Sequence, residues 1–479
     1  MSRTRSAAWT FAITAIALFM VALDNLVVTT ALPVIRADLG SSLSDLEWMV
    51  NAYTLTFAVL LLTGAALGDR FGRRRMFVIG LLIFTAGSAA AALAPTSTTL
   101  ILARAVQGVG GAIVTPLTLT ILSAGVSPER RPLALGAWGG IGGLAIAVGP
   151  VVGGAIAQGV NWHWIFWLNV PVGIVAALLA YFRLHETRGP EGRLDIGGLA
   201  LASSGLLGVV WAVIHGNELG WANPQILAGF AIGGALLLGF VAWELRTSSP
   251  MLPPHLFRSR GFTAANTASL LMYFGMFGSV FLLSQFFQVV QGYNPFEAGL
   301  RVLPWTAMPI FVAPIAGALS ARIGARPIVV GGLALMSFGL AWLAAIAAPN
   351  TDYSAFIVPF AVSGTGMGLF FAPIANVVLS AVRREEEGKA SGANNAIREV
   401  GGVFGVAVLA AIFTANGSYT SPQAYVDGLV PAVWLGAAVV AIAAISALFI
   451  PRHVVGEVVS QVIDPPASEP ASIEQAPAG

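Results

Sequence analysis

The chain has 479 residues, of which 57% are hydrophobic and only 10% are charged, and its formal net charge is +2. Soluble globular domains carry about 25% charged residues, so this composition excludes an ordinary soluble protein and predicts an integral membrane protein. The sequence contains no cysteine, and its five histidines show no ligand spacing. We therefore expect no metal site, and we expect neither a cofactor nor a nucleic-acid partner.

Fourteen apolar segments are long enough to cross a bilayer as helices, which takes about 20 residues each. They lie at about 9–35, 48–67, 76–95, 98–124, 132–157, 166–183, 196–215, 224–245, 262–290, 297–320, 327–347, 355–381, 389–414 and 430–450. The first follows Arg3 and Arg5, as in a signal peptide, but its length indicates an uncleaved span. Strand-like alternation is absent, so we predict an all-α membrane protein with fourteen transmembrane helices.

The basic residues between these segments predict the orientation. With the N-terminus inside, most Lys and Arg residues fall on the cytoplasmic side, as the positive-inside rule requires. They include Arg70, Arg73 to Arg75, Arg130, Arg131, Arg183, Arg188, Arg193, Arg258, Arg260, Arg322, Arg326, Arg383, Arg384 and Lys389. We expect both termini in the cytoplasm and the chain in the inner (cytoplasmic) membrane.

Two of the cytoplasmic loops resemble each other. ALGDRFGRRR (66–75) follows the second segment and ALSARIGARP (318–327) follows the tenth, with Leu, Arg, Gly and Arg at matching positions. Repeated six-helix bundles around a central cavity are one architecture of secondary transporters. The predicted organisation is a bundle at 1–183, an inserted helix pair with linkers at 184–261, a second bundle at 262–450 and a disordered cytoplasmic tail at 451–479.

The first of these loops also contains a cluster of charges. We interpret Asp69, Arg70, Gly72, Arg73 and Arg74 as a conformational latch, in which Gly72 permits a tight turn and Asp69 pairs with an arginine or caps a helix. Chance similarity between two loops rich in Gly and Arg is the alternative.

Five motifs together resemble the major facilitator superfamily, specifically its fourteen-span drug:proton antiporters. They are LDNLVVTTALP (23–33), GDRFGRRR (68–75), ARAVQGVGGA (103–112), GPVVGG (149–154) and WHWIFWLNVPVG (162–173). The chain departs from the usual pattern at Ala65, where Gly is common, and at His163, where Arg is common. The resemblance covers about residues 10–450.

The resemblance implies a transporter, not an enzyme, that works by alternating access and exports hydrophobic or cationic compounds in exchange for protons. It identifies Gly149, Pro150, Gly153 and Gly154 as the antiporter motif, which we interpret as a packing seam that limits leakage. No Walker motif is present, which argues against an ATP-driven pump. The expected partners are a small-molecule substrate, protons and the bilayer, and we expect a monomer. The alternatives are a dedicated metabolite exporter, another transporter of this fold, and a non-transporting membrane sensor.

Charged residues inside the apolar segments are the candidates for proton coupling. Asp24 lies about two-thirds of the way outward along the first segment, and Arg104 lies at a neighbouring depth in the fourth. A buried Asp–Arg contact would stabilise both charges, and it could exchange protons, recognise a charged substrate or remain a static ion pair. Glu399 is the second candidate for the proton carrier, and which of the two acids carries the proton stays open.

Polar residues in the other segments are candidates for the substrate cavity. They are Asn25, Gln285, Gln288, Asn376, Asn395 and Arg398. Each of them could instead form a hydrogen bond between helices.

Overall fold

The computed structural model describes residues 3–127, 131–189, 194–383 and 386–451, so the tail predicted beyond Pro451 lies outside the described residues. Fourteen helices there are long and apolar enough to cross a membrane, which confirms the predicted number. The helices are α1 (Arg3–Leu39), α2 (Leu43–Phe71), α3 (Arg73–Ala92), α4 (Ser97–Gly125), α5 (Arg131–Gly159), α6 (His163–Trp167), α7 (Asn169–Arg183), α8 (Ile196–Leu219), α9 (Pro224–Glu244), η1 (Pro254–Arg258), α10 (Arg260–Val289), α11 (Pro295–Arg301), α12 (Leu303–Thr306), α13 (Met308–Ile323), α14 (Ala325–Ile346), α15 (Tyr353–Ser380), α16 (Glu387–Asn416) and α17 (Pro422–Ala447).

Two predicted spans are interrupted in the structure. The segment predicted as one helix at 297–320 is divided among α11, α12 and α13, and the sixth span is divided between α6 and α7. Pro304 and Pro309 stand near the starts of α12 and α13, where a missing N–H is tolerated. A proline lacks the N–H that would continue the preceding helix, which fits the breaks before α12 and α13. Pro314 is nevertheless accommodated inside α13.

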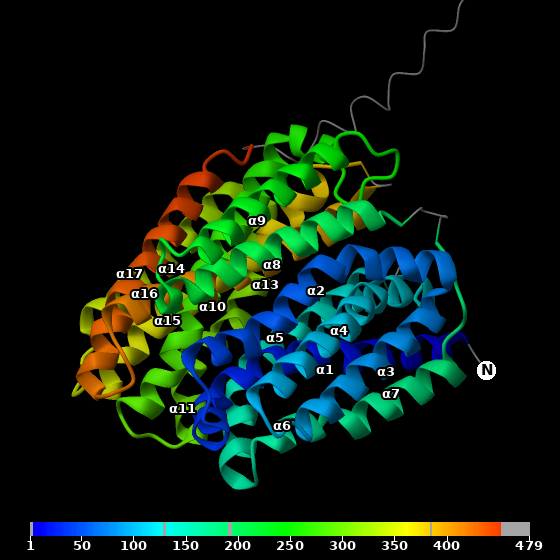
Figure 1. Cartoon of the computed structure of the whole chain (residues 1–479). Coiled ribbons are helices and arrows are strands. Elements are labelled where there is room, and N and C mark those ends of the chain that lie inside the picture. Colours follow the sequence, from blue (N-terminus) through cyan, green and yellow to red (C-terminus); the bar gives the residue numbers. More distant parts are fainter. Residues whose placement is uncertain (1–2, 128–130, 190–193, 384–385, 452–479) are drawn as a thin grey trace, which may run out of the picture.

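The helices form two groups with a pair between them. Helices α1 to α7 pack against one another, and α10 to α17 do the same. Helices α8 and α9 pack together, and α8 also contacts α2 and α16. Figure 1 shows the first group in blue to teal and the second in green to red, with α8 lying between α9 and α2. On this basis we propose that the first bundle ends at residue 183 and that the second begins at residue 262.

The two repeated loops have the same backbone conformation. Gly72 joins α2 to α3 with φ of 108°, and Gly324 joins α13 to α14 with φ of 87°. Each glycine N–H donates 3.0 Å to a carbonyl four residues earlier. Because residues other than glycine rarely adopt such φ values, the turn explains the matching glycines.

The two groups meet along α2 and α16, along α5 and α11, and where α1 ends, a region we call the Arg36 end. Three described hydrogen bonds cross between them, from Gln288 Nε2 to Thr30 O (2.8 Å), Ser284 Oγ to Thr29 O (3.4 Å) and Thr306 Oγ1 to Ala147 O (3.1 Å). The Arg36 guanidinium also lies 3.7 Å from the centre of the Tyr419 ring. These contacts hold the groups together at the Arg36 end.

Candidate functional site

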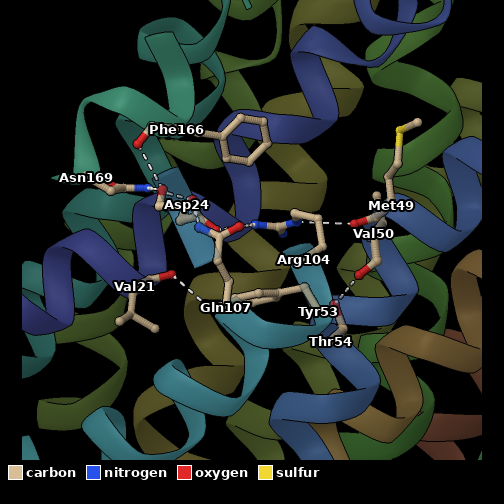
Figure 2. A network of polar contacts seen from close by, with 11 residues as sticks. Val21, Asp24, Met49, Val50, Tyr53, Thr54, Arg104, Gln107, Phe166 and Asn169 are labelled. Carbon is tan, nitrogen blue, oxygen red and sulfur yellow. Dashed lines mark hydrogen bonds and ion pairs between the residues drawn. The ribbon is translucent and has the colours of Figure 1, made fainter. Parts of the chain in front are cut away.

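Asp24 is the centre of a buried polar network formed by α1, α4 and α7 (Figure 2). Its Oδ2 forms an ion pair with Arg104. Its Oδ1 accepts hydrogen bonds from Gln107 Nε2 (3.2 Å) and Asn169 Nδ2 (2.7 Å). Arg104 and Gln107 lie three residues apart on α4, so both side chains leave the same face of that helix.

Arg104 makes contacts beyond the carboxylate. Its Nε donates to Met49 O on α2 (3.2 Å), and Nη1 donates to Gln107 Oε1 (3.0 Å). The guanidinium carbon lies 4.3 Å from the centre of the Tyr53 ring, a cation–π distance. Arg104 therefore joins α2 to the helices that hold Asp24.

The network is dry. Asp24 is 2% exposed and Arg104 is fully buried. Charges at such a depth are tolerated only when they are paired and hydrogen-bonded. The predicted contact between Asp24 and Arg104 is present, and it explains how both charges are accommodated in apolar helices.

Arg398 and Glu399 lie on α16 in the other group. Arg398 donates to the Tyr273 hydroxyl and to Asn395 Oδ1 (3.3 Å), and its guanidinium carbon lies 4.5 Å from the Tyr273 ring centre. Glu399 is half-buried, and its Oε2 has no hydrogen-bond partner among the described residues. Glu399 interacts electrostatically with Tyr53, the same ring that contacts Arg104. Tyr53 is thus a common neighbour of the two candidate proton carriers.

The residues predicted for the substrate cavity are in different environments. Gln288 donates to α1, and Gln285 donates to Phe281 O (2.8 Å) and accepts from the Tyr419 hydroxyl (2.8 Å). Asn395 accepts from Arg398, whereas Asn376 is exposed on α15. Asn25 Oδ1 is buried with no partner among the described residues. In this arrangement the glutamines form hydrogen bonds between or within elements, and the cavity roles of all these residues remain predictions.

The predicted latch makes contacts within the N-terminal group. Arg73 forms an ion pair with Asp69 (2.8 Å), and Gly189 N donates to Asp69 O (3.2 Å). Glu186 accepts from the backbone N–H groups of Arg74 (3.0 Å) and Arg75 (3.1 Å), at the start of α3. A carboxylate at a helix N-terminus compensates the partial positive charge there. Arg70 instead lies exposed, with its guanidinium carbon 5.2 Å from the Phe71 ring centre.

The antiporter motif lies at a seam between elements. A Cβ atom on Gly153 would lie 2.4 Å from Val27 O on α1. One on Gly154 would lie 2.1 Å from Pro295 O on α11, across the boundary between the groups. Small residues allow helix backbones to approach this closely in membranes. The motif thus provides close packing at the position that we expected for a seam.

Sequence reasoning did not select three members of the network, Gln107, Asn169 and Tyr53. The spacing of Gln107 from Arg104 on one helix face was the available signal. Asn169 is 145 residues away from Asp24 along the chain, and only the tertiary fold brings it within hydrogen-bond distance.

Comparisons with known proteins agree with this architecture. Residues 14–405 and 265–472 match the model of the Major Facilitator Superfamily. Multidrug resistance protein Stp of Mycobacterium tuberculosis is 35% identical over 407 residues, which cover 84% of this chain and 75% of Stp. The tetracenomycin C resistance and export protein of Streptomyces glaucescens is 32% identical, over 88% of this chain and 78% of that protein.

The fold also resembles a solved structure. It is a bacterial homologue of the human lysosomal transporter Spinster, in an inward-facing and unoccupied conformation. The TM-score is 0.64 with 17% identity, over 93% of this chain and 97% of that one.

Proposed function

The chain belongs to the major facilitator superfamily, and on that premise we propose that it is a proton-coupled exporter of hydrophobic or cationic drugs or antibiotics. It is a multi-pass membrane protein, and we place it in the inner membrane with both termini in the cytoplasm. Protons moving inward would drive the substrate outward by alternating access. We assign it no enzymatic reaction.

The buried Asp24 network is the observation that carries the proton coupling. The carboxylate receives donors from α4 and α7, and its partner Arg104 also contacts α2. Protonation of Asp24 would remove the negative charge that organises these contacts. A neutral carboxyl accepts weaker hydrogen bonds than an ionised one, so the contacts to Arg104, Gln107 and Asn169 would weaken. Proton binding would therefore change how α1, α2, α4 and α7 are held together. Tyr53, which contacts Arg104 and interacts electrostatically with Glu399, is the residue through which Glu399 would respond to this change.

The contacts at the Arg36 end supply the second half of the proposal. We place this end on the outer side of the membrane, following the predicted orientation. The described hydrogen bonds between the groups would then close the outer side. In the alternating-access cycle that we propose, the state with its outer side closed is the one that takes up substrate from the cytoplasm.

Export of one dedicated compound is a second candidate. It is favoured by the relative from Streptomyces glaucescens, which is named for resistance to tetracenomycin C and its export. A narrow range of transported compounds would favour it, and transport of several unrelated compounds would favour multidrug export.

Transport in proteoliposomes with an imposed pH gradient tests the proposal, with a panel of dyes and antibiotics. We expect gradient-driven movement of at least one compound, its loss in Asp24→Asn and its reduction in Glu399→Gln. Glu218→Gln changes an exposed acid at the end of α8 and should behave as the native chain. The coupling proposal fails if no compound moves with the gradient, or if Asp24→Asn leaves this movement unchanged.

A further inference from the structure

A second acidic site lies on α2, close to the Arg36 end. Glu47 is 3% exposed, and Asn51, one turn further along the same helix face, is fully buried. Glu47 Oε2 and both polar atoms of the Asn51 side chain have no hydrogen-bond partner among the described residues. Unsatisfied polar groups within a membrane protein are unfavourable by several kcal/mol each, and an ionised carboxylate is worse still.

The charged groups around Glu47 do not compensate it. The elements packed against α2 bring charged groups on four helices: Asp24, Arg36 and Asp38 on α1, Arg104 on α4, Arg398 and Glu399 on α16, and His215 and Glu218 on α8. Arg73 to Arg75 lie at the distant end of α3. None of the described ion pairs includes Glu47, and Arg104 is engaged by Asp24. Arg36 lies on the Tyr419 ring, and Tyr419 interacts electrostatically with both Arg36 and Glu47. Glu47 thus has charged neighbours but no ion-pair partner in the part of the chain that the structure describes.

The size of the available space restricts what could satisfy Glu47. A cavity of about 420 Å³ lies at the Arg36 end, lined by residues of α1 together with Val289 and Tyr419. Neither Glu47 nor Asn51 lines it. A proton needs no cavity and neutralises the carboxylate directly, whereas an organic cation would need room beside it.

We propose that Glu47 is a second proton-binding residue, separate from Asp24, which takes up a proton when the two groups close at the Arg36 end and releases it when they part. The inference rests on the alternating-access function proposed above. The proton comes from water on the Arg36 side and returns there, so Glu47 governs the closure of this end without carrying protons across the membrane.

The direction in which pH shifts the balance between the open and closed arrangements follows from the environment of Glu47. In the open arrangement water hydrates Glu47 and stabilises its ionised form. In the closed arrangement its Oε2 is buried without a hydrogen-bond partner among the described residues, so the protonated form is favoured. Raising the pH therefore favours the open end, by at most about tenfold in the open-to-closed ratio per pH unit for one proton.

Spin labels can measure this ratio directly because the chain contains no cysteine. One label is placed at Thr98, exposed at the start of α4, and the other at Ala355, exposed at the start of α15. Distances between them are recorded in lipid nanodiscs from about pH 5.5 to about pH 8.5, without substrate or gradient. We expect the longer distance to gain population as the pH rises. Glu47→Gln should lose the contribution of this one proton, which is a change of at most about tenfold in the open-to-closed ratio per pH unit.

The controls separate this site from the others. Glu218→Gln removes an exposed acid from the same end and should keep the native dependence, and Glu47→Asp should keep most of it. If Glu47→Gln does not yield folded protein, Glu47→Met takes its place, because a methionine side chain has a similar length and no carboxyl group. The proposal is overturned if the native chain shows no pH dependence, or if Glu47→Gln and Glu47→Met keep the native dependence. Because the measurement needs no transport, failure of the export assay would leave its result standing.

Discussion

The carboxylate of Asp24 is held by three residues from two other helices, which make one charged contact and two neutral ones. Arg104 supplies the opposite charge, while Gln107 and Asn169 supply neutral donors. The charged contact and the neutral contacts should therefore differ in their effect on stability. Removing one partner of a buried ion pair leaves an uncompensated charge, whereas removing a neutral donor leaves the charge pair intact.

Arg104→Leu should destabilise the protein by about 3–5 kcal/mol, because it leaves Asp24 buried without a cation. Asn169→Ala is the matched control and should destabilise it by about 1 kcal/mol. Adding Asp24→Asn to Arg104→Leu should recover part of the loss, since the remaining side chain is neutral. Unfolding of the detergent-solubilised protein measures all three variants. Equal losses in Arg104→Leu and Asn169→Ala would contradict this account.

Sequence could predict part of this site. Asp24 and Arg104 were identifiable because each is a charge in an apolar segment, and helix rise placed them at similar depth. Asn169 lacks a charge and is distant in sequence, so nothing local marked it. Glu47 escaped notice because the predicted second span began at residue 48, whereas α2 begins at Leu43 and includes Glu47 in its buried face.

At the scale of elements, the close approach of α5 to α11 limits how the two groups can close. Gly154 lies where a Cβ atom would come within 2.1 Å of Pro295 O. Backbone atoms cannot move aside as a flexible side chain could, so any larger residue must separate the two helices.

Gly154→Ala should shift the spin-label distance between Thr98 and Ala355 toward the open arrangement and lower the rate of transport. Gly143→Ala is the control on the same helix, because nothing lies within 4 Å of its added Cβ. The seam is not required for closure if both variants keep the native distance distribution.

The number of spans was predictable because each apolar segment is long, and the repeated Gly72 and Gly324 predicted two equivalent turns. The division of residues 295–323 into three helices was not predicted. Pro304 and Pro309 lie near the starts of α12 and α13, whereas Pro314 lies inside α13. A hydropathy average does not distinguish these positions, so only the backbone geometry shows where the chain restarts.

At the scale of the whole molecule, the linker that leads from α9 into the second group is fastened by one acidic residue. Glu386 precedes α16 and lies 2.5 Å from His255 Nε2 in η1 and 3.3 Å from Arg383 Nε. Hydrogen bonds from Arg383 and His255 lower the pKa of Glu386 from its ordinary value of 4.5. A lowered pKa means that the folded state favours the ionised form.

The stabilisation from Glu386 should therefore be present above about pH 4.5 and disappear as the pH falls through the lowered pKa. Glu386→Gln should lower the unfolding temperature at about pH 7, and the difference from the native chain should shrink below about pH 4. Glu387→Gln changes an exposed neighbour and should show no such pH dependence. A difference for Glu386→Gln that is constant with pH would exclude the ion pairs as its cause.

The separation of Asp24 from Arg104 along the chain affects how the protein enters the membrane during synthesis. The two residues are 80 positions apart, and translation adds about 5–20 residues per second. Asp24 therefore waits about 4–16 seconds before its cation has even been synthesised, and longer for Asn169. During that interval the first helix carries a carboxyl group without its cation. We therefore expect this carboxyl to be protonated or hydrated until the fourth helix arrives.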